Sequence, residues 1–338
     1  MKTSITKLIG RAAAAAALLA LAPGAALACA CGCGVFDVGA SSIIPSDAQS
    51  GLTVWFRYDW MDQNQNWEGG AKAPAADNDD KKLETSFYTF GGQYMVNRNW
   101  MVMAELPIFD RSLTTTDDGT VFGPAGGLYT GHLTTLGDLQ LTAMYTGFSE
   151  DMSTGIGLGV KLPTGDYTGP TGPLGGAEFD RDSLPGTGST DLIINGYHAG
   201  ALGLKGALSY FVQARYQFAV MTQGDYRPGN ELDSAVGVAY NFGRAGPFSR
   251  VAPGLQLIDS YRAHDSGANS DAPNSGYERL LVAPGVDVRI NRVHLYADVE
   301  LPVYQHANAA EGAVKVSDGV SGQLVASALY KMRLAYDF

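Results

Sequence analysis

The three cysteines of the chain, Cys29, Cys31 and Cys33, are spaced two residues apart in the string CACGCG. Closely spaced thiolates suit soft metal ions such as copper(I) or zinc, and the intervening glycine lets the backbone fold around an ion. Lipid attachment to Cys29 and a disulfide between two of the three remain open alternatives, because an oxidising periplasm permits disulfides. The cluster predicts a metal or redox role with copper or zinc as its ion, and we expect no other cofactor.

A second group of reactive side chains stands at alternate positions of apolar segments. Arg or Lys facing lipid at mid-depth costs about 2 to 4 kcal/mol, so we expect these charges to face the interior of a membrane protein. They are either a packed salt-bridge network or a polar constriction that selects solutes, and a solute pathway can run through such a network. The predicted lumen-lining residues are Arg57, Asp59, Glu105, Lys161, Arg215, Arg279, Asp287, Arg289, Asp298, Glu300, Lys331 and Arg333.

Hydrolytic chemistry is the alternative class of function. A lipid-hydrolysing barrel needs a nucleophile and a base within hydrogen-bond reach, and His198 stands near Asn195 and Ser189 in the sequence. No nucleophile motif frames these residues. We therefore predict no catalytic residues and no enzyme.

The amino terminus indicates export. Lys2, Lys7 and Arg11 precede the apolar residues 12–21 and the small residues 26–28, which is the pattern of a cleaved signal peptide over residues 1–28. The apolar stretch is shorter than the roughly 20 residues that a membrane-spanning helix needs. No later run of 18 apolar residues occurs, so a closed β-barrel is the remaining structure that spans a membrane.

Period-2 alternation bounded by turn residues predicts an all-β fold, a transmembrane antiparallel up-and-down β-barrel of about 12 strands over residues 51–338. Residues 29–50 would form a Cys-rich periplasmic tail or a plug in the lumen. The expected strands are 51–60, 85–96, 99–107, 136–148, 153–163, 188–199, 204–217, 230–242, 249–260, 277–290, 292–304 and 322–338.

The connections between these strands alternate short and long, as in outer-membrane barrels with short periplasmic turns and longer external loops. An even number of strands then places both termini in the periplasm of a Gram-negative cell envelope. The terminal Phe338 predicts recognition by the barrel-assembly machinery. Aromatic residues near strand ends, including Trp55 and Trp100, predict interfacial girdles that contact outer-membrane lipid.

The composition excludes one class of partner. The formal net charge is -11 and the pI about 4.8, whereas a nucleic-acid-binding protein needs a dense basic face. We therefore expect a small-molecule solute, and a periplasmic protein as a further candidate partner, but no nucleic acid.

Three short strings carry a family resemblance: LGDLQL at 136–141, GLGVKLPTGDY at 157–167 and LPGTGSTD at 184–191. They resemble the outer-membrane transporter family of meta-pathway phenol-degradation proteins. The resemblance implies a barrel in the outer membrane with a role in solute uptake. Residues 163–166 of the second string are also the residues of an ordinary turn, and a binding role for Asp166 is the alternative.

These patterns together predict an outer-membrane channel or transporter for a small solute, hydrophobic or aromatic through the resemblance. Two alternatives stay open. One is a barrel in a soft-metal or redox system that uses the N-terminal cysteines, and the other is a structural anchor for a periplasmic partner.

Overall fold

The computed structural model describes residues 51–116, 126–168, 179, 181–203, 207–309 and 322–338. The cysteines, the expected signal peptide and the expected tail lie outside these residues. Within the described part of the chain, no helix has the length and apolar character needed to cross a membrane.

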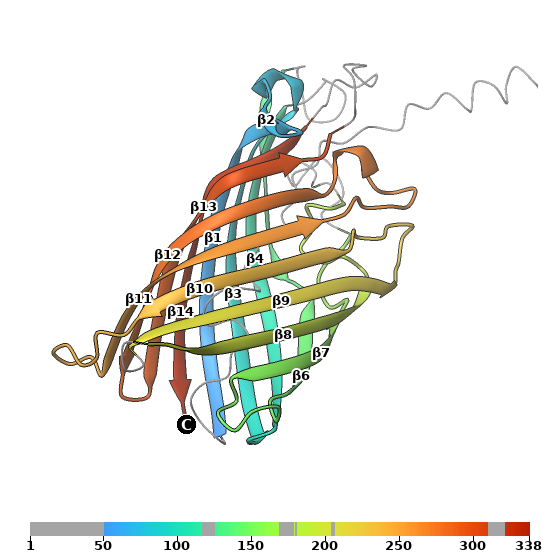
Figure 1. The fold of residues 1–338 in the computed structure, drawn as a ribbon. Helices are drawn as coiled ribbons and strands as arrows, with labels where there is room; N and C mark the ends of the chain where they lie inside the picture. The colour runs from blue at the N-terminus through green and yellow to red at the C-terminus, as the bar shows by residue number, and fades with distance from the viewer. Residues whose placement is uncertain (1–50, 117–125, 169–178, 180, 204–206, 310–321) are drawn as a thin grey trace, which may run out of the picture.

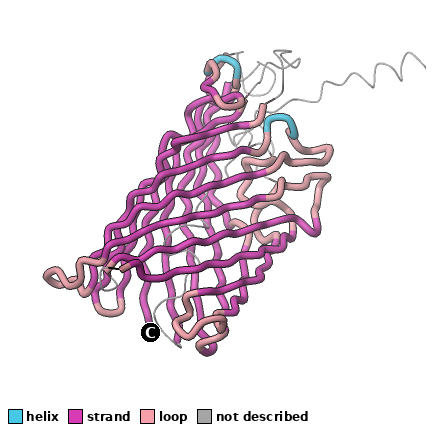
Figure 2. Tube along the Cα trace, viewed as in Figure 1, coloured by secondary structure: helices cyan, strands magenta, loops and turns pink. Residues whose placement is uncertain are grey.

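The described residues form a closed antiparallel β-barrel with strongly tilted strands (Figures 1 and 2). Most strands pair with the next strand in the chain, but β3 pairs with β1 and β6 with β4, and β14 pairs back with β1, for example at Arg57 opposite Arg333. The strands are β1 (Gly51–Glu68), β2 (Ala71–Lys72), β3 (Asp80–Asn97), β4 (Trp100–Thr116), β5 (Leu128–Leu136), β6 (Leu139–Tyr145), β7 (Thr154–Leu162), β8 (Thr190–Leu202), β9 (Leu208–Met221), β10 (Glu231–Tyr240), β11 (Arg250–Arg262), β12 (Tyr277–Ile290), β13 (Val293–Ala307) and β14 (Gln323–Asp337). Two short 3-10 helices, η1 (Ala75–Asp77) and η3 (Ala272–Asn274), lie in loops.

The predicted barrel of twelve strands is confirmed, because β5 and β6 occupy one position in the wall and β2 is a two-residue extension of β1. β5 pairs with the upper half of β4 and β6 with the lower half. The sequence analysis missed β5 and assigned residues 108–135 to a loop. It also ended β1 and β4 too early, because their outer ends carry polar residues on both faces and lose the apolar alternation.

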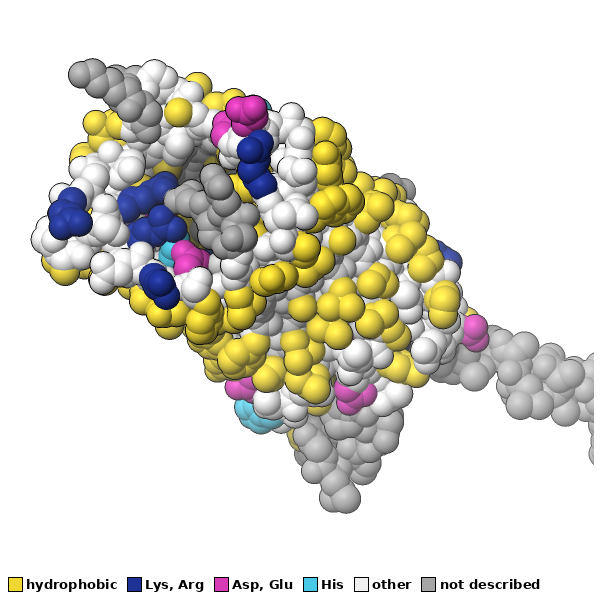
Figure 3. All heavy atoms as spheres, turned by 90° about the horizontal axis from the view of Figure 1, so that it is seen from below, with side chains coloured by type: hydrophobic (Ala, Val, Ile, Leu, Met, Phe, Trp, Pro, Cys, Tyr) yellow, Lys and Arg dark blue, Asp and Glu magenta, His cyan; other side chains and the backbone are white. Residues whose placement is uncertain are grey.

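The two faces of the wall follow residue parity. On β13, Leu295 is 41% exposed while Tyr296 and Asp298 are buried, as the alternation predicts. Apolar side chains cover the outer wall (Figure 3), among them Leu52, Val54, Val102, Leu158, Ile194, Val236, Leu257 and Leu334. Trp100 belongs to this outer surface, but Trp55 does not: its position opposite Ala335 and Gly91 faces the interior, where it is only 4% exposed.

Both described ends of the barrel, at Gly51 and Phe338, lie at the same end, which also carries the short turns (Figure 1). We call this the lower end. The β12–β13 turn there consists of Asn291 and Arg292, and Asn291 has a φ of 53°, a conformation that tight hairpin turns require and that Asn tolerates. This turn sets the register that places Arg289 opposite His294 at the lower mouth.

Candidate solute pathway in the barrel interior

Two cavities are stacked inside the barrel. The lower cavity has a volume of about 340 Å³ and is lined mainly by β8 to β14 near the lower end. The upper cavity has a volume of about 140 Å³ and is lined by β1, β3, β4, β6, β7 and β9 to β11 with upper loops. On β1, Thr53 borders the lower cavity and Arg57 the upper one, which gives their order along the barrel.

A layer of charged and polar side chains separates the two cavities. On the side of the upper cavity, Arg57 donates to Asp59 at 2.8 Å and lies 3.7 Å from Glu105. On the side of the lower cavity, Tyr296 donates to Asp298 at 2.6 Å and Gln256 donates to the same carboxylate at 2.7 Å. Hydrogen-bonded charged and polar side chains therefore bound each cavity on the side that faces the other cavity.

The structure places the twelve predicted lumen-lining residues on the inner side of the wall. Nine of them are buried: Arg57, Asp59, Glu105, Lys161, Arg215, Arg279, Asp298, Glu300 and Lys331. Asp287, Arg289 and Arg333 are partly exposed and line the lower cavity. The network includes Lys331 with Glu300 at 3.0 Å and Arg215 with Asp233 at 3.8 Å.

The wall is interrupted where β5 ends and β6 begins. Among the described residues, β5 pairs with β4 alone, whereas β6 pairs with both β4 and β7. Pro107 on β4 has no N–H to offer the ladder, and its carbonyl accepts a hydrogen bond from Gly137 instead. At this interruption, the chain that follows β7 turns into the barrel.

The three strings that carry the family resemblance meet at this interruption. Asp138 accepts hydrogen bonds from the Gly165 N–H at 3.0 Å and from the Thr187 N–H and hydroxyl at 3.1 and 2.9 Å. Lys161 bridges Asp138 at 3.3 Å and Asp191 at 2.8 Å. We call Asp138, Lys161, Gly165, Thr187 and Asp191 the wall knot.

The wall knot depends on a close crossing of two backbone segments. A Cβ added to Gly186 would lie 2.4 Å from the Gly165 carbonyl, a distance that real Cβ atoms do not show. Glycine is therefore required at this crossing. The turn residues at 163–166 hold the loop inside the barrel; Asp166 itself accepts hydrogen bonds from Thr168 and does not line either cavity.

We call the described residues of the β7–β8 connection, 163–168 and 181–189, the inward loop. This loop contacts the β9–β10 loop through Arg181. Its guanidinium lies 4.2 Å from the ring centroid of Tyr226 and 5.3 Å from that of Tyr167, and it donates to the Gly186 carbonyl. Tyr226 in turn donates to Asp265 at 2.6 Å. Burial raises the pKa of Tyr226, so its hydroxyl remains a neutral donor at physiological pH.

Aromatic rings line one side of the upper cavity. Phe87 and Phe109 pack edge to face with centroids 4.9 Å apart, and the Arg111 guanidinium lies 4.9 Å from the Phe109 centroid. Arg111 also donates to the Ser183 carbonyl of the inward loop. The sequence analysis missed Arg111, although the parity of Glu105, continued past Pro107, would have placed it on the inner face.

The residues considered for hydrolysis do not meet. His198 faces outward and hydrogen bonds with Thr154 at 2.8 Å and Tyr210 at 2.9 Å, whereas Asn195 and Ser189 are buried on the inner side. In the described part of the chain, no group of three His, Cys, Asp or Glu side chains has the geometry to hold a metal ion. This observation does not test the predicted cysteine site, because the cysteines lie outside the described residues.

No protein-family model matches the chain, and no curated protein matches it. Among solved structures, an outer membrane channel from Pseudomonas putida F1 is similar with a TM-score of 0.61 and 10% identity, over 89% of this chain and 100% of the channel. This likeness shows the fold. A monoaromatic hydrocarbon channel matches with a TM-score of 0.43 and 11% identity over 94% of this chain and 99% of its own, and a toluene transporter from Ralstonia pickettii with 0.40 and 12% over 86% and 90%. At these scores the two say nothing about the solute of this chain.

Proposed function

We propose that the protein is an outer-membrane channel that carries a small apolar or aromatic solute through its lumen, with both termini in the periplasm. The observation that carries the proposal is the pair of stacked cavities, with a layer of charged and polar side chains between them. A solute moves between them when the side chains of this layer rearrange. The apolar outer wall and the fold shared with an outer membrane channel support the location.

The upper cavity supports the class of solute. Its volume of about 140 Å³ is close to the roughly 150 Å³ of an apolar cavity that holds one benzene molecule. Phe87 and Phe109 offer ring edges and faces to an aromatic guest, and Arg111 adds a polar contact at the rim. The cavity therefore has about the volume of a single-ring solute, and its lining combines these rings with charged side chains.

The experiment is solute flux into liposomes that contain the refolded mature protein. We expect benzyl alcohol to enter these liposomes faster than protein-free ones, and Phe109→Trp to slow this flux by filling the upper cavity. Phe148→Trp is the matched control, since Phe148 is 56% exposed outside the lumen. Equal flux with and without protein would refute the channel.

A soft-metal role is the second candidate, and a row of methionines favours it. Met95 lies opposite Met101, and Met101 opposite Met144, in three adjacent strands near the lower end. All three are buried and face inward, and opposite residues in a sheet have Cβ atoms about 4.5 to 5.5 Å apart. Thioethers and thiolates both prefer copper(I), so this row and the cysteines would suit the same ion.

Copper(I) competition against a coloured chelator tests this second candidate. We expect replacement of the cysteines by serine to weaken copper binding strongly and Met101→Leu to weaken it further, while Met332→Leu on the outer wall has no effect. Leucine preserves the packing of methionine and removes only the sulfur. Copper binding that is insensitive to both the cysteine and the Met101 replacements would exclude the candidate.

A further inference from the structure

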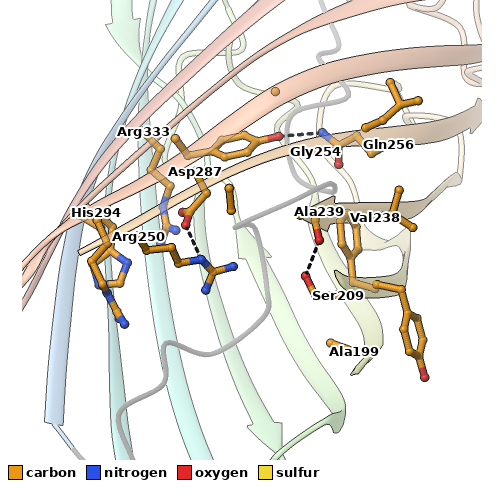
Figure 4. A pocket seen from close by; sticks show the side chains of 18 of the residues that line it. Ala199, Ser209, Val238, Ala239, Arg250, Gly254, Gln256, Asp287, His294 and Arg333 are labelled. Atoms are coloured by element: carbon orange, nitrogen blue, oxygen red, sulfur yellow. Dashed lines mark hydrogen bonds and ion pairs between the residues drawn. The ribbon is translucent and has the colours of Figure 1, made fainter. Parts of the chain in front are cut away.

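The lower cavity has two unlike walls (Figure 4). Charged side chains enter it from β11 to β14, including Arg250, Asp287, His294 and Arg333. The facing wall, from β8 to β11, is made of small and apolar residues such as Ala199, Phe211, Ala239 and Ala252. The cavity is therefore amphipathic from one side to the other.

The carboxylates of the charged wall already have partners. Asp287 lies 3.3 Å from Arg250. Asp337 accepts a hydrogen bond from the Thr53 hydroxyl at 2.7 Å, and its other oxygen is 2.6 Å from the His294 ring and 3.5 Å from Arg289. Each carboxylate in the cavity is thus matched with a cation other than Arg333.

Arg333 differs from the other cations of the cavity. Among the described residues it has no carboxylate within ion-pair distance; its close contact is the Trp55 ring, 4.6 Å from the guanidinium carbon. Glu105 is engaged with Arg57, which lies opposite Arg333 across the β1–β14 pair. A guanidinium in a cation–π contact keeps its N–H donors, and those donors match a carboxylate in a two-point contact.

The size of the cavity limits what binds there. A volume of about 340 Å³ lies at the small end of the range for ligand pockets, roughly 300 to 1,000 Å³. This accommodates one ring with a carboxylate substituent. The carboxylate would face Arg333, and the ring would lie against Phe211 and Ala252 on the other wall.

We infer that the lower cavity is a binding site for small carboxylates with an apolar, preferably aromatic, body, and that Arg333 holds the carboxylate. The inference rests on the proposed channel, of which it would be the lower solute site. Recognition requires both walls: acetate lacks the body and benzyl alcohol lacks the charge, so neither satisfies the site as benzoate does.

Calorimetric titration of the full mature protein in detergent micelles tests the site with benzoate, benzyl alcohol and acetate as probes. We expect benzoate to bind the wild type most tightly. Arg333→Gln should weaken benzoate binding by at least about tenfold, as expected for the loss of a charge-assisted hydrogen bond, and leave benzyl alcohol unchanged. Arg292→Gln is the matched control, because it removes an equal charge from the lower turn without touching the cavity.

The inference is overturned if Arg333→Gln binds benzoate like the wild type, or if the wild type binds benzoate no better than benzyl alcohol. Should Arg333→Gln not fold, Arg333→Lys replaces it: the charge remains, the two-point contact is lost, and benzoate binding should still weaken. Liposome flux separates the two proposals. Flux of benzyl alcohol without benzoate binding refutes only the carboxylate site, and benzoate binding without any flux refutes only the channel.

Discussion

At the scale of single residues, some cations of the barrel interior lie beside more than one carboxylate. Lys331 on β14 lies opposite Asp59 on β1 and opposite Asp298 on β13, and its ammonium group is 3.0 Å from Glu300. It is 2% exposed and Glu300 is fully buried. This single lysine therefore stabilises the seam at which the barrel closes.

Substitution of Lys331 tests how much this lysine contributes to the free energy of unfolding. We expect Lys331→Met to lower the free energy of unfolding by about 3 to 5 kcal/mol, because it leaves buried carboxylates without a cation. Adding Glu300→Gln should restore part of this loss. Denaturant unfolding of the refolded barrel measures both variants.

The matched control is Lys82→Met, which breaks the exposed pair of Lys82 with Glu84 and should cost no more than about 1 kcal/mol. Equal losses for Lys331→Met and Lys82→Met would show that the buried network does not hold the seam.

At the scale of elements, the interruption between β5 and β6 determines the shape of the pathway. Beside this interruption, the described residues of the inward loop, 163–168 and 181–189, enter the barrel interior. The wall knot around Asp138 and the contact of Arg181 with Tyr226 fasten this loop, together with hydrogen bonds from Arg111 to Ser183 and from Tyr167 to Gln223. The contact of Arg181 with Tyr226 is a stacking interaction, which a single substitution removes.

The Tyr226 ring should therefore contribute to holding the inward loop in place. A cation–π contact is worth about 0.5 to 2 kcal/mol, so Tyr226→Leu should raise the open probability in planar-bilayer recordings by roughly 2- to 30-fold. Tyr226→Phe keeps the ring and loses only the hydroxyl that donates to Asp265, and it should lie closer to wild type.

Tyr261→Leu, on the outer wall, is the control for the loss of a tyrosine. If Tyr226→Leu and Tyr226→Phe have the same open probability, the hydrogen bond from Tyr226 to Asp265 holds the loop, and the ring does not.

At the scale of the whole molecule, closure of the sheet gives the protein two chemically different ends. The lower end carries the short turns, both described chain ends, and a cluster of Lys and Arg side chains around a hollowed mouth (Figure 3). The upper end carries the longer connections and the inward loop. The smaller cavity, of about 140 Å³, lies toward the upper end, and the larger one, of about 340 Å³, lies toward the lower end.

Cysteine labelling of intact cells tests which end faces outward, in a background without the three native cysteines. The proposed orientation predicts that a membrane-impermeant reagent labels Ala268→Cys, in an upper loop, on intact cells. Arg244→Cys, in a lower turn, should react only after the outer membrane is permeabilised; both positions are exposed. The reverse pattern would invert the proposed topology.

The sequence alone determined the barrel, its strand order and the inner and outer faces. This was possible because each strand must place apolar residues toward lipid on its own, as the alternation of Leu295 with Tyr296 and Asp298 does, and because short and long connections are local features. A strand that extends beyond the lipid does not need an apolar outer face. The polar upper ends of β1 and β4 and the whole of β5 were therefore not predicted.

Only the tertiary structure decided what the inner residues do. The strings around Asp138, Gly165 and Thr187 are up to about fifty positions apart, and they meet because the wall is interrupted. Trp55 looked like a girdle residue, but the register of β1 against β14 places it under Arg333. Which cation pairs with which carboxylate, and which one lies over a ring instead, depends on the tilt and stagger with which the strands close, and no single strand carries that information.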